Sequence, residues 1–503
     1  MSQNRSVELD DVQGLMRFGY KHLTEACFLL LHVKDPAAAR AWLAQAPVTS
    51  AVKADPLPET ALHVALTSEG LRALEVALDL LAKFSDEFVA GMASDAARAR
   101  RLGDIGTNDP SGWRWGAGER VPHVAVLLYA RSGRLAAWEQ EIEAQCGAGF
   151  VRIERLSTSD LHGMEPFGFV DGISQPHIDW ERKRPVHDQD QIKYSNVSCL
   201  GEFLLGYPNE YGLYTPRPLL TPQNDPGGLL PRAEDAPDQA DLGRNGCYLV
   251  LRQLHQDVHG FWRELDRQAE GNTDVRERLA AAMAGRKKNG EPLVAPSGES
   301  ADNDAPAQRS NLNNFTYETD PRGLRCPLGA HIRRMNPRNA DLPGGPGGIL
   351  SRLWRMLGFN TAAREQDLVA STRFHRLLRR GRPFGAGVMP TLSAMPSSPG
   401  TETGLHFICL VANITRQFEF VQSAWLMGSK FAGLTAERDP LLGHRLPNPG
   451  ESPTDGFSIP QADGPDHRLN NLPQFVTVQG GAYFFLPGIR ALRYLTTTNS
   501  KGV

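Results

Sequence analysis

Runs of apolar residues alternate along the chain with segments whose apolar residues recur every three or four positions. In the first third of the chain this pattern predicts strand, helix, strand, and then strand, helix, strand. The predicted strands are "ACFLLLHV" at 26–33, "TALHVALT" at 60–67, "PHVAVLLYA" at 122–130 and "FVRIERL" at 150–156. The predicted helices are "DPAAARAWLAQA" at 35–46, "SEGLRALEVAL" at 68–78 and "LAAWEQEIEAQC" at 135–146.

A second series of similar order begins near residue 245. Its predicted strands are "NGCYLVLRQL" at 245–254, "GLHFICLVA" at 404–412 and "FVTVQGGAYFFLPG" at 475–488, and its predicted helices are "DVHGFWRELDRQ" at 257–268 and "QFEFVQSAWLM" at 417–427. This order is that of the ferredoxin-like arrangement, an antiparallel sheet with helices packed on it. We therefore predict an α+β fold of two ferredoxin-like domains, residues 1–190 and 191–503, with long loop insertions in the second.

Composition excludes several classes of protein. Hydrophobic residues make up 41% of the 503 residues and charged residues 22%, as in an average folded, water-soluble chain. The net charge of −3 provides no basic field for nucleic acid. The first apolar run is too short to cross a membrane and no cleavage pattern follows it, so we expect no membrane association and a cytoplasmic location. The six cysteines lack a C-x-x-C pair, which argues against a zinc ribbon, a redox dithiol and covalently attached haem.

The stretch "GFVDGISQP" at 168–176 places Asp171 between glycines after an apolar run. Asp-Gly after such a run is typical of a turn, because glycine accepts positive φ and aspartate bonds to its own backbone. The same carboxylate is also a candidate reagent. These nine residues alone do not separate the two interpretations.

Two groups of histidines are candidate metal ligands. His255 and His259 stand four apart on what reads as a helix, but the glutamate of an H-E-x-x-H site is absent and no third ligand stands out. His331 lies in "RCPLGAHIRRMNPR", with Arg333, Arg334 and Arg338 beside it. An imidazole with neighbouring cations suits an iron cofactor that carries carboxylates. A hydrogen-bonded structural histidine in a basic turn would give the same pattern.

Here the chain resembles a known family. "GFVDG" matches the GxxDG motif of the dye-decolourising peroxidases, and four later segments are similar to that family in the same order. They are "CPLGAHIRRMNPR", "LLRRGRPFG", "GLHFICLVANITRQFEFVQ" and "FVTVQGGAYFFLPG". The resemblance covers most of the chain, whose length is similar to that of the larger members. It implies a fold of two ferredoxin-like domains, in agreement with the pattern above.

The resemblance implies a haem peroxidase that uses hydrogen peroxide to oxidise bulky organic substrates, such as dyes and phenolics, through a ferryl intermediate. One haem b per chain would be ligated by His331. Asp171 would be the general base and then the general acid, and Arg379 would stabilise charge on the leaving oxygen and contact a propionate. Such a protein needs peroxide and an organic reductant; self-association into a homo-oligomer is left open.

Further residues take roles by the same resemblance. Glu419 would accept the second imidazole N–H of the iron ligand, which raises its basicity. Leu405 and Phe407, on alternate positions of one strand, would line the distal pocket. Arg334 is the predicted propionate partner, with Arg333 and Arg338 as competitors. Which surface tryptophan or tyrosine would relay electrons from large dyes is not indicated.

Two departures from the family pattern put substrate preference in doubt. Arg382 and His406 stand where apolar residues are common, and the sequence leaves open whether either alters the polarity of the pocket. Two rival functions remain. One is a haem-binding or haem-processing protein without efficient peroxide turnover, and the other is a non-haem binding or structural module.

Overall fold

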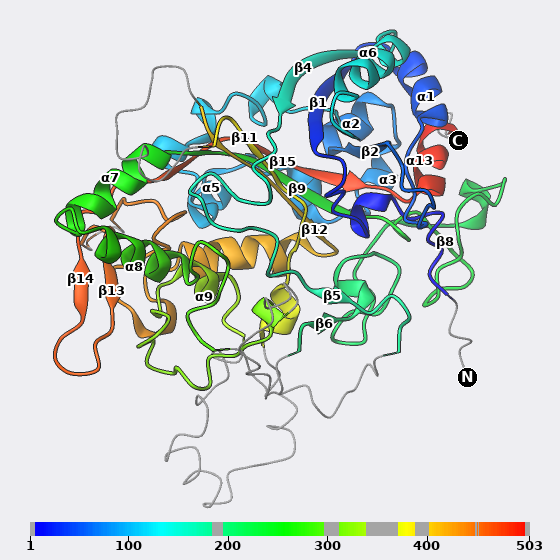
Figure 1. Ribbon diagram of the computed structural model, residues 1–503. Coiled ribbons are helices and arrows are strands. Elements are labelled where there is room, and N and C mark those ends of the chain that lie inside the picture. The colour runs from blue at the N-terminus through cyan, green and yellow to red at the C-terminus, as the bar shows by residue number, and fades with distance from the viewer. Residues whose placement is uncertain are drawn as a thin grey trace, which may run out of the picture.

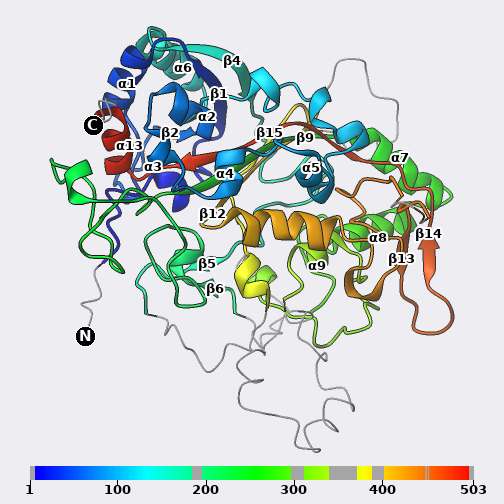
Figure 2. The same ribbon diagram turned by 180° about the vertical axis from the view of Figure 1, so that it is seen from behind.

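The computed structural model describes residues 6–183, 195–295, 311–338, 371–387, 402–447, 450 and 452–497. Figures 1 and 2 show two regions of strands and helices joined by long strands that run between them. Among the described residues, nine strands form the large sheet, in the order β10-β12-β9-β15-β2-β3-β1-β4, with β11 beside β12. No helix in these ranges is long and apolar enough to cross a membrane.

The N-terminal half of the sheet follows the predicted order. Its strands are β1 (Glu25–Val33), β2 (Thr60–Leu66), β3 (Val124–Ala130) and β4 (Phe150–Ser157), all paired antiparallel. Helices α1 (Pro36–Gln45) and α6 (Leu135–Cys146) connect them in the ferredoxin-like manner. The Asp35 side chain accepts the amides of Ala37 and Ala38, and Pro36 follows as first helical residue, which fixes where α1 begins.

The C-terminal half repeats this plan. Its strands are β9 (Cys247–Gln256), β10 (Leu378–Arg379), β11 (Arg382–Phe384), β12 (Gly404–Val411) and β15 (Val476–Leu486). Its helices are α7 (Val258–Gln268), α8 (Thr273–Ala284), α9 (His331–Met335) and the π-helical segments η9 (Ile414–Glu419) and η10 (Val421–Leu426). The two halves join where β15 pairs with β2, with Phe485 opposite Leu66.

Shorter elements complete the described chain. The helices are α2 (Ser68–Ala73), α3 (Leu78–Leu81), α4 (Asp86–Ala90), α5 (Ala96–Leu102) and α13 (Ile489–Thr497). Small two-stranded sheets pair β5 (His177–Ile178) with β6 (Val197–Ser198), β7 (Leu219–Leu220) with β8 (Ala240–Asp241), and β13 (Phe457–Ile459) with β14 (His467–Leu469). The predicted α+β fold of two ferredoxin-like units is confirmed. The predicted division between residues 190 and 191 lies outside the described residues and stays a prediction.

Three local predictions differ from the structure. The helix expected over 68–78 ends at Ala73, because Leu74 and Val76 are both buried and residues two apart cannot face the same side of a helix. The chain turns at Glu75, which has a φ of 61°. The helix expected over 417–427 begins earlier, at Ile414, and is wound as π-helix.

The third difference concerns the pair of histidines weighed as metal ligands. His255 belongs to β9 and His259 to α7. The Asp257 side chain caps α7 between them, so the four-residue helical spacing does not exist. Among the described residues no cluster of three or more histidine, cysteine, aspartate or glutamate side chains has the geometry to hold a metal ion.

Candidate active site

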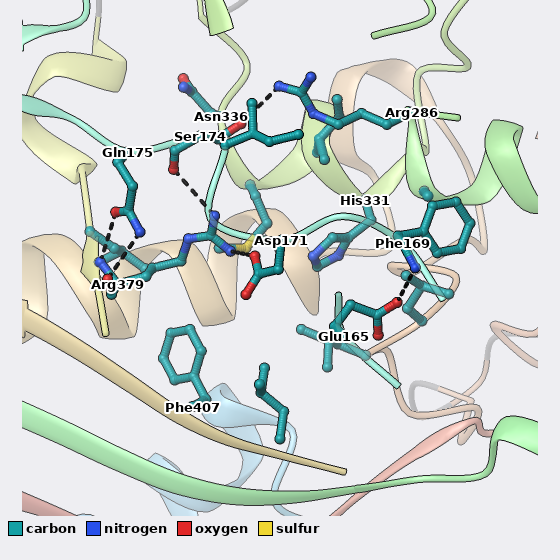
Figure 3. A pocket seen from close by; sticks show the side chains of 18 of the residues that line it. Glu165, Phe169, Asp171, Ser174, Gln175, Arg286, His331, Asn336, Arg379 and Phe407 are labelled. Atoms are coloured by element: carbon teal, nitrogen blue, oxygen red, sulfur yellow. Dashed lines mark hydrogen bonds and ion pairs between the residues drawn. The ribbon is translucent and has the colours of Figure 1, made fainter. Parts of the chain in front are cut away.

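One cavity brings together segments that are far apart in the sequence. It lies against the face of the C-terminal half-sheet formed by β9, β12 and β15, and the loop over 165–176 and helix α9 contribute further walls. Figure 3 shows side chains from these elements converging on it. Much of the wall is apolar: Phe169, Ile173, Leu254, Ile332, Met335, Leu405, Phe407, Leu441 and Val476. Such a surface suits a flat organic group and excludes water from it.

His331 is the first residue of α9 and projects into this cavity (Figure 3). Its Nδ1 lies 2.9 Å from Oδ2 of Asp439, whose side chain is fully buried. The other carboxylate oxygen of Asp439 accepts the amides of Leu441 and Leu442, which hold the acid in place. Burial opposes ionisation of Asp439, but the imidazole and the amides outweigh it, so the pKa of Asp439 falls below its usual value. The carboxylate therefore fixes the ring and leaves Nε2 for a ligand.

The prediction that Glu419 is the carboxylate partner of His331 is wrong. Glu419 accepts the Tyr483 hydroxyl at 2.9 Å and pairs with Nε of Arg98 at 3.0 Å. In the described chain it is not among the residues that line the cavity. Glu419 lies at the end of η9, on the side that packs against β15 and α5, and the position beside the imidazole belongs to Asp439.

Asp171 lies in the loop that follows β4. Its backbone amide donates to Gly163 at 2.9 Å, and Gly168 and Gly172 on either side adopt φ values of 94° and 77°. These left-handed positions favour glycine and let the loop present the carboxylate to the cavity. Oδ1 of Asp171 is 3.4 Å from Nη1 of Arg379, and the side chain is 39% exposed. The turn predicted from Asp-Gly is present, and it holds the acid in the cavity.

Arg379 ends β10 and is tied to the same loop. Its backbone amide donates to Oε1 of Gln175 at 3.1 Å, and its carbonyl accepts Nε2 of Gln175 at 3.0 Å. Its Nη2 donates to the carbonyl of Ser174 at 3.3 Å. The paired amide contacts fix the backbone of Arg379, and the contact with Ser174 fixes its guanidinium, relative to the Asp171 loop that follows the N-terminal strands.

Leu405 and Phe407 line the cavity, as predicted from their alternate positions on β12. His406 between them faces the opposite side, where it stacks on Phe384 at 4.5 Å and hydrogen-bonds the carbonyl of Ser157. Arg382 donates to backbone carbonyls before β1. Neither His406 nor Arg382 lines this cavity, so neither contributes a polar group to its wall.

The prediction that Arg334 contacts the cofactor is also wrong. Its side chain is buried and donates to the carbonyls of Trp425, Gly428 and Glu437, at 2.8–3.0 Å. The competitors are occupied in the same manner: Arg333 donates to the carbonyls of Cys326 and Asp320, and Arg338 to those of Asn313 and Phe315. All three arginines hydrogen-bond backbone carbonyls of the segments that pack around α9, and none of them lines the cavity.

Comparisons with known proteins agree with this geometry. A dye-decolorizing peroxidase of Auricularia auricula-judae is 29% identical, with 97% of this chain and 86% of the relative covered. A multifunctional dye peroxidase of an Amycolatopsis species is 28% identical over 86% of this chain and 82% of the relative. A crystal structure of a fungal peroxidase of this type, from Auricularia auricula-judae, has a TM-score of 0.72 at 26% identity, covering 98% of this chain and all of that one.

Over nearly its whole length the chain is similar to dye-decolourising peroxidases. No family model matches it. The relatives span nearly its whole length, so the assignment covers both halves of the sheet and the cavity between the loop and α9. Peroxidases of this type are haem enzymes, and the comparison therefore supports haem as the group for which the cavity is built.

The side chains of this peroxidase fit a haem. An imidazole with Nδ1 anchored on a buried carboxylate is the donor arrangement of a metal-ligating histidine. The apolar wall opposite the ring matches a macrocycle. Three arginines on the cavity lining, Arg286, Arg376 and Arg379, supply cations for propionates.

Sequence reasoning missed four of the residues that line this site or support it. Arg286 is held by the carbonyls of Gly290 and Leu312 and by Ser174, and burial lowers its pKa to about 10. The other three are Glu165, Arg376 and Asp439. Arg376 directly precedes the segment "LLRRGRPFG" at 377–385, so its position did carry a signal. Asp439 stands in "AERDPLL", which reads as an ordinary turn.

Proposed function

We propose that this peroxidase uses hydrogen peroxide to oxidise bulky organic substrates such as dyes and phenolics, with one haem b ligated by Nε2 of His331. The observation that carries the proposal is the placement of His331, Asp171 and Arg379 on one cavity, with Asp439 hydrogen-bonded to the imidazole. Asp439 anchors His331, and Asp171 lies beside Arg379. When bound, the haem supplies the iron that binds peroxide and takes up its oxidising equivalents.

Asp171 has the position of the proton carrier. Its carboxylate takes the proton from one peroxide oxygen and delivers it to the other, directly or through one water, first as base and then as acid. Its partial exposure and its long contact to Arg379 leave its oxygens open to such a transfer. A positioned acid–base group of this kind contributes about 10²–10⁴-fold to the rate.

Arg379 has the position of the electrostatic stabiliser. Its guanidinium donates to the carbonyl of Ser174 and its backbone is tied to Gln175, so it does not have to reorganise as charge develops on the departing oxygen. Leu405 and Phe407 keep the neighbouring wall apolar and limit entry to small molecules. Arg286, Arg376 and Arg379 replace Arg334 as the proposed propionate partners.

Two further proposals accompany the activity. Dyes too large for the cavity would give up electrons through a tyrosine or tryptophan at the surface.

A reducing, cytoplasmic location is supported by the cysteines: all six are described, all are buried, and no disulfide joins them.

The test is an absorption spectrum of haemin-reconstituted protein before and after one equivalent of hydrogen peroxide. Wild type is compared with His331→Ala and with the control His162→Ala, whose histidine is a solvent-exposed loop residue. We expect a Soret band that shifts on peroxide addition in the wild type and in the control, and that is displaced or absent in His331→Ala. A Soret band unchanged by His331→Ala would reject His331 as the ligand.

A further inference from the structure

A second cavity adjoins the active-site cavity at Asp171. It has a volume of about 750 Å³ and shares Asp171, Gln175 and Arg379 with the first. We call it the outer cavity. Its walls are formed by parts of four segments: residues 17–22, 49–58, 159–175 and 379–383. A cleft of this size accommodates a ligand of one or two rings.

Positive charge dominates the outer cavity. Six lysines and arginines line it: Arg17, Lys21, Lys53, Arg379, Arg380 and Arg382. Two carboxylates, Asp160 and Asp171, face them. Asp171 pairs with Arg379, and Asp160 lies near His162. The remaining cations therefore leave the cavity with a net positive charge.

The arginines are fixed in place without being neutralised. Arg17 donates to the carbonyl of Ala51, and Arg382 to the carbonyls of Tyr20 and Leu23. Arg380 is equally engaged, with the carbonyls of Leu15, Met16 and Arg379 as its acceptors. Carbonyl dipoles orient a guanidinium but carry no net charge. Among the described residues, none of the three arginines forms an ion pair with a carboxylate.

Burial of Arg380 adds to this argument. Burial lowers its pKa to about 10, which still leaves the group charged at neutral pH. A partly buried cation without a counter-charge is costly, and an anion bound nearby relieves that cost. The same walls carry apolar side chains, among them Phe18, Leu57, Leu161 and Met164. The outer cavity thus combines an aromatic-sized apolar surface with fixed positive charge.

We propose that the outer cavity binds an anionic aromatic reductant, a phenol that carries a carboxylate or sulfonate, beside Asp171 and Arg379. The inference rests on the proposed peroxidase function and names its substrate class. Two bound phenols in turn each lose one electron and the proton of the O–H bond. Peroxide takes up both electrons and both protons as its O–O bond breaks, so H₂O₂ and two phenols give two waters and two phenoxyl radicals.

The test compares two phenols that differ only in charge. Ferulate is an anion and methyl ferulate is neutral, and both carry the same oxidisable ring. Lys21 and Lys53 are exposed, so the double variant Lys21→Glu/Lys53→Glu reverses charge with little risk to folding. The matched control is Lys34→Glu, an exposed lysine beyond the opposite end of β1 from Lys21, about 30 Å away along the strand.

Two readouts are taken on the haem-loaded protein. The first is the ratio of the KM for ferulate to the KM for methyl ferulate, and the second is the Kd for ferulate measured by calorimetry without peroxide. We expect the double variant to raise both about tenfold or more, because four units of charge change at the mouth of the cavity. High salt should raise both in the wild type. The control should move neither.

The outcomes separate this inference from the proposed function. If the wild type oxidises both phenols and the double variant leaves the KM ratio and the Kd unchanged, the outer cavity is not the anion site, and the peroxidase function stands. If the haem-loaded wild type oxidises neither phenol with peroxide but binds ferulate through the two lysines, the site stands and the proposed function fails.

Discussion

The two acids on either side of the proposed haem are held in opposite ways. Asp439 is fully buried, accepts two backbone amides and lies 2.9 Å from the ring of His331. Asp171 is 39% exposed, and its side-chain contact to Arg379 is 3.4 Å long. A carboxylate that orients a ligand benefits from rigid hydrogen bonds, whereas one that carries a proton between two oxygens needs free lone pairs. The predictions below test this division.

The largest effect is expected for Asp171→Asn. Asparagine keeps the size of the side chain but cannot accept and return a proton, so kcat/KM for peroxide should fall about 10²–10⁴-fold. The haem spectrum should remain, because His331 and Asp439 are untouched. Stopped-flow spectroscopy of peroxide consumption measures the change, with the exposed Asp10→Asn as control. Peroxide turnover within a factor of two of wild type would return Asp171 to the role of a turn residue.

Asp439→Asn should weaken the haem site itself. An amide still accepts the backbone N–H groups of Leu441 and Leu442, but it loses the charge that favours the imidazole as donor. Changes of this kind typically lower metal affinity about 10–100-fold. A haemin titration followed at the Soret band measures it. Equal affinities in variant and wild type would show that Asp439 does not support the ligand.

Glu419→Gln is the matched contrast, because Glu419 was the sequence-based candidate for the same role. We expect haemin affinity to remain unchanged. Stability should fall by about 1–3 kcal/mol, because the charged Arg98 loses its buried carboxylate partner. Urea unfolding measures the loss. A fall in haemin affinity matching that of Asp439→Asn would restore the original assignment.

The two carboxylates also show what the sequence can predict. Asp171 stands between glycines and His331 beside a run of arginines. Both are short motifs that can be recognised in the sequence. Asp439 is 108 residues from His331, and only the packing of α9 against the chain that follows η10 brings the two together. The alternation on β12 likewise predicted that Leu405 and Phe407 share one face, because a strand has a period of two, and the family resemblance indicated that this face lines the pocket.

The arginines failed as predictions for a related reason. Arg333 and Arg334 follow His331 on α9, where a helix turns consecutive side chains about 100° apart, so proximity in the chain does not place them on its cavity. Arg338 lies beyond the end of α9, at a left-handed position with a φ of 59°. Their guanidinium groups are instead buried on backbone carbonyls. Arginines close to a ligand in the sequence therefore indicate positive charge in that region, but not which way their side chains point.

A stability effect of similar size, but dependent on pH, is expected for Glu165, which lines the cavity beside Asp171 and accepts the amides of Phe167 and Phe169. Burial raises its pKa to about 7 from an ordinary value of 4.5, partly opposed by those amides. Between these two values the folded state holds a proton that the unfolded chain has released. Stability from this group is therefore fully present below about pH 4.5 and is lost as pH rises through about 7.

Glu165→Gln should remove this dependence. The introduced amide does not titrate. When the pH falls from 8 to 4.5, the free energy of unfolding of the wild type should therefore rise by about 1–3 kcal/mol relative to that of the variant. Denaturant unfolding of both proteins across this pH range measures the difference, with the exposed Glu119→Gln as control. Parallel pH profiles for Glu165→Gln and wild type would mean that Glu165 is ionised throughout. An ionised Glu165 would then hold the loop that carries Asp171, just as the ionised Asp439 holds His331. In that case Asp171 would be the one acid of the three that is not held rigidly.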